Sequence, residues 1–336
     1  MAKQRIAVVG ATGMVGGAFL KVLEEYGMSD FDYTLLASEK SAGKAVAFLN
    51  QEYRIEPLTE TSFDKGYDVA LFSAGGSVSA KYAPIAAAQG AVVVDNSSFW
   101  RMDKEVPLVV PEVNPEDIKW NKGVIANPNC STIQAVVALN PIHKKYGIKR
   151  IVYSTYQSVS GAGMSGWMEL ENGIRAYADN VPCDPAAFPH PIFNNCIPHI
   201  DAFLENGYTK EEIKMVNETR KILHDESIAI TATTVRVPVF SAHSEAINLE
   251  LSAPYDIDEI RALLADAPGV VLADDPKNNV YPLASIAAGR DDVFVGRIRR
   301  DESIENGLNL WVVSDNVRKG AASNAVQIAQ IVLKNL

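Results

Sequence analysis

The sequence predicts an α/β protein of two domains: a doubly wound parallel sheet, then an α+β domain with an open, mostly antiparallel sheet. The first observation is length, since 336 residues are many for a single hydrophobic core. The second is a series of short, uniformly apolar runs in the first third, typical of strands buried on both faces. The third is a set of longer alternating runs after Pro141, typical of a sheet with one covered face.

Composition excludes several functional classes. The net charge of −10 leaves no basic face for nucleic acid or an anionic membrane, and we expect neither partner. Three cysteines (Cys130, Cys183 and Cys196) are too few, and odd in number, for a disulfide framework. We find no apolar run that could span a bilayer and no signal-peptide pattern. These features predict a cytoplasmic protein.

A glycine-rich turn follows the first apolar run. Residues 5–10 predict a buried strand, and Gly10-Ala-Thr-Gly13-Met-Val-Gly16 comes next, before apolar residues at helical spacing. Strand, glycine turn and helix form the dinucleotide-binding pattern of a Rossmann domain, in which a pyrophosphate lies at the helix N-terminus. The spacing G-x-x-G-x-x-G departs from the usual G-x-G-x-x-G, and a plain strand–helix turn is the alternative.

The second predicted strand, residues 33–38, indicates which dinucleotide. NAD-binding domains usually place an acidic residue here for the ribose hydroxyls. The chain instead offers Ser38, Lys40 and Ser41, whose hydroxyls and charge suit a 2′-phosphate. Glu39 would suit either cofactor, and a solvated lysine turn is the alternative. On balance the sequence favours NADP over NAD.

The remaining first-domain elements continue the doubly wound pattern. We predict a strand that ends in a glycine turn at residues 68–76, further strands at 91–95, 107–111 and 123–126, and a helix at 77–90 interrupted near Pro84. Ligands of such sheets lie at the carboxyl ends of the strands. We therefore expect the glycine turn and Cys130, which follows the last strand, to share one cleft.

The second domain is predicted from alternating runs. They lie at residues 150–159, 228–238, 246–252, 293–299 and 308–313. A helical stripe over 321–336 is expected to pack on the first domain, and the segment 179–198 to form a long surface loop. The predicted domains are therefore 1–128 with 320–336, and 129–319.

Cys130 is the leading candidate for chemistry. It lies in Asn127-Pro128-Asn129-Cys130-Ser131-Thr132, between a short apolar strand and an apolar helical run. A helix N-terminus lowers the pKa of a thiol and favours the nucleophilic thiolate. Its unpaired N–H groups could also hold an oxyanion. The alternative is a small buried core residue.

A cysteine nucleophile needs a base, and His243 is the best placed of five histidines. It is expected in a short connection between two strands, close in sequence to Arg236. An arginine at a strand end is typical of a clamp for carboxylate or phosphate. A buried structural histidine and a cross-strand ion pair are the respective alternatives.

A zinc site is the competing use of the histidines. Four candidate ligands fall in the long loop: Cys183, His190, Cys196 and His199. Their spacing lacks the paired C-x2-4-C pattern of zinc sites, so no metal is predicted.

Taken together, these motifs give a resemblance to the aspartate-β-semialdehyde dehydrogenases of the bacterial type along essentially the whole chain. Further segments that carry it are Ser-Ala-Gly-Gly-Ser-Val-Ser, Asp-Asn-Ser-Ser-Phe-Trp-Arg, Tyr-Gln-Ser-Val-Ser-Gly-Ala-Gly, Glu-Glu-Ile-Lys-Met and Arg-Val-Pro-Val-Phe-Ser-Ala-His.

The resemblance implies roles for individual residues. Cys130 is the nucleophile, His243 the general acid–base, and Gln157 orients the reacting group. Binding of the substrate is implied for Arg236 (carboxylate), Glu211 (amino group), Gln157 and Asn129, and of phosphate for Arg101 and Lys214. Contacts with NADP are implied for Gly10, Thr12, Gly13, Met14, Val15, Ser38, Lys40, Ser41, Ser73, Ser160, Gly161 and Asn316.

The resemblance also implies the reaction. It is the NADPH-dependent reductive dephosphorylation of aspartyl phosphate to aspartate semialdehyde through a Cys130 acyl-thioester, in biosynthesis of lysine, threonine, methionine and isoleucine. A homodimer is implied as well. Three alternatives stay open: an N-acetyl-glutamyl-phosphate reductase, which would not need Glu211, a glyceraldehyde-3-phosphate dehydrogenase-like enzyme, and a non-catalytic NADP-binding sensor.

Overall fold

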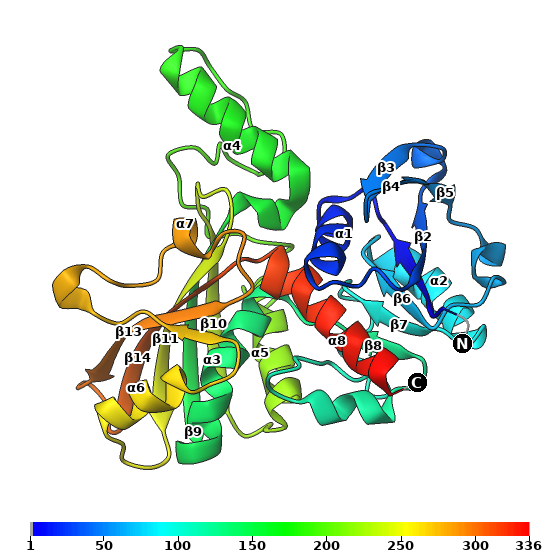
Figure 1. Cartoon of the computed structure of the whole chain (residues 1–336). Helices are drawn as coiled ribbons and strands as arrows, with labels where there is room; N and C mark the ends of the chain where they lie inside the picture. Colours follow the sequence, from blue (N-terminus) through cyan, green and yellow to red (C-terminus); the bar gives the residue numbers. More distant parts are fainter. Residues whose placement is uncertain (1–2, 336) are drawn as a thin grey trace. The chain divides into compact units, whose positions relative to one another are not determined.

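The computed structural model describes residues 3–335 (Figure 1). The chain divides into two compact units, Met1–Asn129 with Ala321–Leu336, and Cys130–Gly320. Both divisions lie one residue from the predicted boundaries.

Unit 1 contains a six-stranded parallel sheet in the order β5-β2-β1-β6-β7-β8. Its strands are β1 (Arg5–Val9), β2 (Asp32–Ala37), β5 (Glu56–Pro57), β6 (Val69–Phe72), β7 (Val92–Asp95) and β8 (Val124–Ala126). Its helices are α1 (Met14–Glu25), α2 (Gly76–Ala88) and α8 (Ser323–Lys334). A small hairpin, β3 (Ala45–Phe48) with β4 (Gln51–Arg54), was not expected from the sequence. The doubly wound parallel sheet is confirmed.

The centre of this sheet creates a switch in strand order. β1 pairs with β2 on one side and with β6 on the other. The chain therefore first extends the sheet from β1 through β2 to β5, and then extends it on the opposite side of β1 through β6, β7 and β8. A crevice forms at the carboxyl ends of strands where the order reverses. The glycine turn after β1 and the Ser73 turn after β6 therefore flank the same crevice.

The C-terminal helix completes the core of unit 1. In α8, Val326, Ile328 and Ala329 are fully buried among residues of β1, β6 and α1. The apolar stripe read from the sequence is thus the face that packs on the sheet, and that prediction is confirmed.

Two predictions for unit 1 are wrong, and both concern proline. Helix α2 runs through Pro84 without interruption. Pro84 is exposed, so water can satisfy the carbonyl group that lost its N–H partner. Residues 107–111 form only an isolated bridge from Leu108 to Ala126 instead of a strand, because a proline at each end removes ladder donors.

Unit 2 contains a second six-stranded sheet, in the order β10-β9-β11-β14-β13-β12. Its strands are β9 (Ile148–Gln157), β10 (Ala229–Arg236), β11 (His243–Leu251), β12 (Val270–Leu272), β13 (Val293–Asp301) and β14 (Gly307–Ser314). Its helices are α3 (Cys130–Tyr146), α4 (Gly163–Ala178), α5 (Lys210–Leu223), α6 (Ile257–Ala265) and α7 (Ala284–Ala287).

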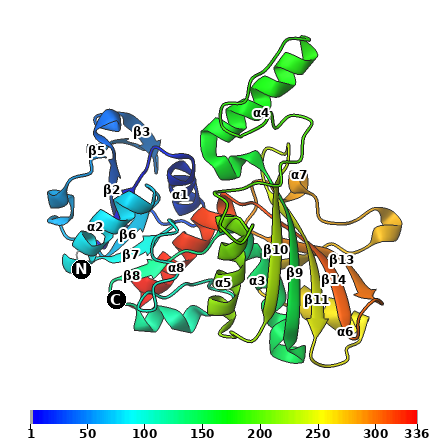
Figure 2. The same cartoon turned by 180° about the vertical axis from the view of Figure 1, so that it is seen from behind.

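The sheet of unit 2 is covered by helices on one face. Helices α3, α5 and α6 pack against its strands, as both views show (Figure 1, Figure 2). The three central pairs are antiparallel, as predicted, whereas β10 pairs with β9 and β12 with β13 in parallel. The parallel pair of β9 and β10 follows from the long connection between them, which contains α4 and α5.

The predicted loop at 179–198 contains no helix or strand, as expected. It returns alongside α4, and the two form a projection from unit 2 (Figure 1). A small apolar cluster of Val159, Leu170, Ile192 and Ile197 holds its base.

Candidate active site

Cys130 is the first residue of α3, as the sequence predicts. The thiol is partly exposed, and the first helical turn contains no acidic side chain. Negative charge on sulfur is favoured at such a position. Gly320 packs directly against it, since a Cβ added at Gly320 would lie 2.8 Å from the Cys130 Cβ.

Arg236 is the last residue of β10, which confirms its predicted place at a strand end. It is 6% exposed, and its Nη1 donates to the carbonyl oxygen of Ser158 at 2.7 Å. Burial lowers the pKa of Arg236, while the charges of Glu211 and Cys130 act to raise it. The guanidinium therefore lies within electrostatic range of both groups and stabilises a thiolate at Cys130.

His243 is fully buried and begins strand β11, so the prediction of a position between strands is wrong by one residue. Two groups of Ser158 contact its Nδ1, the backbone N–H at 3.1 Å and the Oγ at 3.0 Å. Because Nδ1 accepts the backbone N–H, the ring proton of the neutral form lies on Nε2. Nε2 has no hydrogen-bond partner among the described residues.

The charge state of His243 follows from its surroundings. Burial, and then the positive charge of Arg236, lower its pKa well below the ordinary value. The imidazole is therefore neutral at neutral pH and presents an N–H donor at Nε2. A neutral imidazole of this kind can polarise a carbonyl oxygen or stabilise an oxyanion.

Asn316 is 4% exposed and lies behind His243. Its Oδ1 accepts from Ser158 Oγ at 3.0 Å, Ser160 Oγ at 3.1 Å and the Ala242 N–H at 3.1 Å. Ala242 has a φ of +70°, a conformation that costs free energy for any residue with a Cβ. The Asn316 side chain thus holds the strained backbone that immediately precedes His243.

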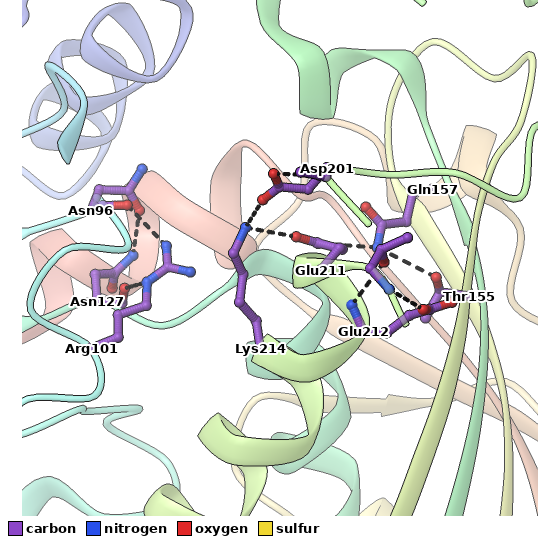
Figure 3. Close-up of polar contacts among 11 residues, drawn as sticks. Asn96, Arg101, Asn127, Thr155, Gln157, Asp201, Glu211, Glu212 and Lys214 are labelled. Atoms are coloured by element: carbon purple, nitrogen blue, oxygen red, sulfur yellow. Dashed lines mark hydrogen bonds and ion pairs between the residues drawn. The ribbon is translucent and has the colours of Figure 1, made fainter. Parts of the chain in front are cut away.

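A second group of polar side chains surrounds Glu211 on α5 (Figure 3). Its Oε1 accepts from Gln157 Nε2 at 3.3 Å, and its Oε2 lies 3.2 Å from Lys214 Nζ. Gln157 Nε2 is also 3.4 Å from Thr155 Oγ1. Glu211 and Gln157 are almost completely buried, so a ligand here would displace little water from them.

Lys214 contacts a further carboxylate, Asp201, at 2.8 Å (Figure 3). Burial acts to lower the pKa of Lys214, but the charges of Glu211 and Asp201 outweigh it and raise the pKa. Burial likewise acts to raise the pKa of Asp201, but the hydrogen bonds from Lys214 and the Ala202 N–H, together with the charges of Lys214 and Lys210, outweigh it, and the pKa falls. Lys214 is therefore a fixed cation between two carboxylates.

The glycine turn of unit 1 is tightly packed. Gly10 has a φ of +86°, and an added Cβ would lie 2.2 Å from the carbonyl oxygen of Ser73. At Gly16 an added Cβ would lie 2.0 Å from the Gly10 carbonyl oxygen. Gly13 is the N-cap of α1, and no side chain caps that helix end. Met14 and Val15 begin the helix, so its first N–H groups face the crevice without a side-chain cap.

The turn after β2 lies beside the glycine turn. Ser38 precedes the short helical turn Glu39–Ser41, and Thr12 Oγ1 lies 3.4 Å from Ser41 Oγ. Lys40 lies between Ser38 and Ser41 in the sequence, and its side chain is exposed. This arrangement brings together the two segments in which the sequence placed phosphate and ribose contacts.

Arg101 and Asn129 complete the predicted residues of unit 1. Arg101 is buried, and its guanidinium donates to the carbonyl oxygens of Asn127 at 2.9 Å and Asn96 at 3.0 Å (Figure 3). Asn127 Nδ2 in turn donates to Asn96 Oδ1 at 2.8 Å. Asn129 is buried and directly precedes Cys130.

The remaining predicted residues, Ser160 and Gly161, lie against the cluster in unit 2. A Cβ added at Gly161 would lie 2.6 Å from Arg236 Nη1 and 3.4 Å from His243 Nε2. Within residues 3–335, no group of three or more His, Cys, Asp and Glu side chains could hold a metal ion, which includes the four candidates of the long loop. In the same range, no helix is both long and apolar enough to cross a membrane.

Three contributing residues were not predicted: Ser158, Asp201 and Ala242. Ser158 directly follows Gln157, and Ala242 directly precedes His243. Their adjacency to predicted site residues was therefore the sequence feature that could have identified them. Asp201 offers no such signal, because it reaches Lys214 from a different segment.

The fold and the cluster together define a class, the two-domain semialdehyde dehydrogenases. The family model described as "Semialdehyde dehydrogenase, NAD binding domain" matches residues 5–121, and "Semialdehyde dehydrogenase, dimerisation domain" matches 139–319. This class consists of oxidoreductases that use a pyridine nucleotide.

Individual relatives narrow the class. An aspartate-semialdehyde dehydrogenase of Aquifex aeolicus is 56% identical over 333 residues, covering 98% of each chain. That of Bacillus subtilis is 49% identical over 337 residues, covering 98% of this chain and 97% of its own. The crystal structure of aspartate semialdehyde dehydrogenase II from Vibrio cholerae, complexed with ASA, has a TM-score of 0.96 at 48% identity and covers 100% of this chain and 99% of its own. The chain belongs to the aspartate-semialdehyde dehydrogenase family.

A more distant structure bears on the cofactor. The aspartate semialdehyde dehydrogenase from Candida albicans, solved with NADP, has a TM-score of 0.77 at 25% identity and covers 99% of each chain.

Proposed function

We propose that the chain catalyses the NADPH-dependent reductive dephosphorylation of L-aspartyl-4-phosphate to L-aspartate-4-semialdehyde, in biosynthesis of lysine, threonine, methionine and isoleucine. The observation that carries the proposal is a single cluster in unit 2, with two buried side chains and one partly exposed thiol. It joins a helix-terminal thiol, Cys130, to a neutral histidine, His243, and a buried guanidinium, Arg236. The names of the relatives support the choice of substrate.

Cys130 begins the reaction. Its thiolate attacks the acyl carbon of the phosphorylated substrate, so that a C–S bond forms while the C–O bond to phosphate breaks. Phosphate leaves with the electron pair, and an acyl-thioester remains on Cys130. NADPH, when bound, would supply the hydride that reduces the thioester carbon. The resulting alkoxide re-forms its C=O bond as the C–S bond breaks, and the Cys130 thiolate is restored.

His243 stabilises the oxyanion of this sequence. Its Nε2–H is the donor available in the neutral ring, and Ser158 fixes that tautomer from the opposite side. In this role the acid–base residue acts mainly by donating a hydrogen bond to the oxygen on which negative charge develops. Because Cys130 departs as a thiolate, the His243 ring does not have to donate a proton to the sulfur.

The substrate is held by side chains of opposite charge. Arg236 would bind the α-carboxylate and Glu211 the ammonium group, with Gln157 and Asn129 orienting the reacting carbon. A bidentate guanidinium–carboxylate pair fixes orientation as well as adding affinity. Gln157 already donates to Glu211, which links the ammonium site to the group that positions the acyl carbon.

Phosphate would be bound by Lys214 and Arg101. Lys214 is held by Glu211 and Asp201, so phosphate would exchange with the Asp201 contact, which is the more exposed of the two. Arg101 is fixed by two backbone carbonyl groups, which leaves its orientation set in advance.

Unit 1 fits a dinucleotide. The glycine turn packs so closely on the Ser73 turn that Gly10 has no room for a side chain, and the uncapped start of α1 offers N–H donors for a pyrophosphate. Gly13, Thr12, Met14, Val15 and Ser73 would line this part of the site. We further propose NADP as the cofactor, with Ser38, Lys40 and Ser41 at the 2′-phosphate and Ser160, Gly161 and Asn316 near the nicotinamide. Unit 1 would thus be the dinucleotide-binding domain, and unit 2 the catalytic and dimerisation domain of a homodimer.

The first experiment follows NADPH absorbance with aspartate semialdehyde, NADP and phosphate. We expect turnover that requires both Cys130, tested by Cys130→Ser, and phosphate. The exposed Cys196→Ser is the matched control and should keep full activity.

Two results would contradict the proposal. Turnover only with N-acetyl-glutamate semialdehyde would favour the rival reductase. NADP binding without turnover of either substrate, together with slow, pH-independent alkylation of Cys130, would favour the non-catalytic sensor.

A further inference from the structure

A carboxyl group is buried behind the catalytic cluster, at Glu245. It lies two residues after His243 on β11 and therefore on the same face of the strand. It is 0% exposed, and among the described residues neither carboxyl oxygen has a partner at ordinary hydrogen-bond geometry, although Gln134 is near enough to affect its pKa. An ionised carboxylate in such a position would be strongly unfavourable.

The groups that face Glu245 come from every element packed around it. Helix α3 contributes Gln134, α5 contributes Glu211, and β9 contributes Tyr153. Thr155 of β9 and Val312 of β14 are its direct cross-strand neighbours. The one charged group among them is another carboxylate. Burial, and then the charge of Glu211, raise the pKa of Glu245 well above its ordinary value, while a hydrogen bond with Gln134 acts to lower it. The side chain therefore keeps its proton at neutral pH.

Gln134 has a buried acceptor that a protonated Glu245 could donate to. It lies four residues after Cys130, so both face the same side of α3. Its Nε2 donates to the carbonyl oxygen of His243 at 3.3 Å, while its Oε1 is buried without a donor in the described part of the chain. This bond ties the helix that carries the nucleophile to the strand that carries the histidine.

We propose that Glu245 is a positioning residue: a neutral carboxylic acid whose O–H donates to Gln134 Oε1. The amide of Gln134 is then fixed so that its Nε2 holds the His243 carbonyl, and the pair sets Cys130 and His243 at their working separation. One hydrogen bond would satisfy an orphan acceptor and an orphan acid together. The kinetic consequence rests on the proposed function, whereas the protonation state does not.

The kinetic test compares two substitutions. Glu245→Gln keeps a donor for Gln134 Oε1 and should retain kcat within about threefold, whereas Glu245→Leu removes the donor and should lower kcat by about 10- to 100-fold. KM for the semialdehyde should change little, because the substrate-binding groups lie on other elements. Glu250→Gln is the matched control, since Glu250 lies on the same strand with its carboxylate paired to Lys149.

The protonation test needs no turnover. At neutral pH in D2O, infrared spectra of the wild-type protein should contain a protonated-carboxyl band that Glu245→Gln removes and Glu250→Gln does not. Unfolding measured against pH gives a second readout. The unfolded state loses the Glu245 proton near pH 4.3 while the native state keeps it, so the wild-type unfolding constant should rise about tenfold per pH unit relative to Glu245→Gln. His243 is present in both proteins, so its titration cancels.

Three results would overturn the proposal. They are a Glu245→Gln variant as impaired as Glu245→Leu, a Glu245→Leu variant with wild-type kcat, or the absence of a protonated-carboxyl band assigned to Glu245. A failure of the proposed reaction would be recognised separately, because the wild-type protein would then lack turnover while the infrared band persisted.

Discussion

The nucleotide crevice of unit 1 and the catalytic cluster of unit 2 are built in different ways. The crevice is made of backbone: a glycine at φ +86°, an uncapped helix end and a turn pressed against the carbonyl oxygen of Ser73. The cluster is made of buried side chains whose charges oppose or balance one another, such as Arg236 with Glu211. In the first region shape is fixed by backbone conformation and backbone packing, and in the second by the packing of side chains.

This difference has consequences for substitutions. A change in the crevice should act through steric fit and backbone strain, and its effect on activity should come through binding of the cofactor. A change in the cluster should act through charge, proton position or orientation, and its effects should spread to neighbouring groups. Substitutions at five positions test that contrast.

The largest effect is expected at Arg236. Arg236→Lys keeps the charge but loses the planar fork that binds a carboxylate, so kcat/KM should fall by about 100-fold or more. Steady-state kinetics measures this. Arg175→Lys, on exposed α4, should leave kcat/KM unchanged. A loss of less than about threefold at Arg236 would show that charge alone suffices.

The crevice is tested by two glycines with positive φ. Gly10→Ala and Gly27→Ala should each cost about 1 kcal/mol of stability from backbone strain. Only Gly10→Ala also produces a clash, with the Ser73 carbonyl oxygen, and only it should weaken NADP binding, by about tenfold or more. Calorimetric titration and thermal unfolding measure the two effects. Equal NADP affinities would contradict the role of shape.

Asn316 separates cofactor contact from positioning. Asn316→Ala leaves the Ala242 N–H and two serine hydroxyls without their acceptor, so kcat should fall by about tenfold. If Asn316 mainly contacts NADP, its dissociation constant should rise instead while kcat is retained. Asn195→Ala in the 179–198 loop is the control.

The buried His243 gives a pH-dependent prediction. Below about pH 6.5 the unfolded state gains a proton that the native ring resists, because the native pKa is lowered. Relative to His243→Asn, the native state should therefore lose about 1.4 kcal/mol of stability for each unit by which the pH is lowered below about 6.5. Denaturant unfolding from pH 7 to pH 5 measures it, with exposed His190→Asn as control. Parallel curves for wild type and His243→Asn would contradict a lowered pKa.

The smallest effect is expected at Lys40. Lys40→Ala removes one exposed charge near the 2′-phosphate, and NADP should bind a few-fold more weakly while NAD is unaffected. Lys21→Ala on the exposed face of α1 serves as the control. An equal loss of affinity for NAD would show that Lys40 contacts a part of the cofactor other than the 2′-phosphate.

Local sequence determined most of the elements. The strand–glycine–helix unit, the helix that begins at Cys130 and the apolar stripe of α8 were all predictable, because each depends on side-chain periodicity or backbone freedom within a few residues. The resemblance then selected residues such as Glu211, which spacing alone would assign to a surface ion pair. In the structure that carboxylate is almost completely buried.

Tertiary structure decided the rest. The positive φ of Ala242, the contact of Asp201 with Lys214 and the burial of Glu245 depend on segments far apart in the chain. The protonation states of Glu245 and His243 are properties of their surroundings, since desolvation and neighbouring charge set the pKa of both groups. Sequence determined which chemical groups were available, and packing decided which of them are charged and where they point.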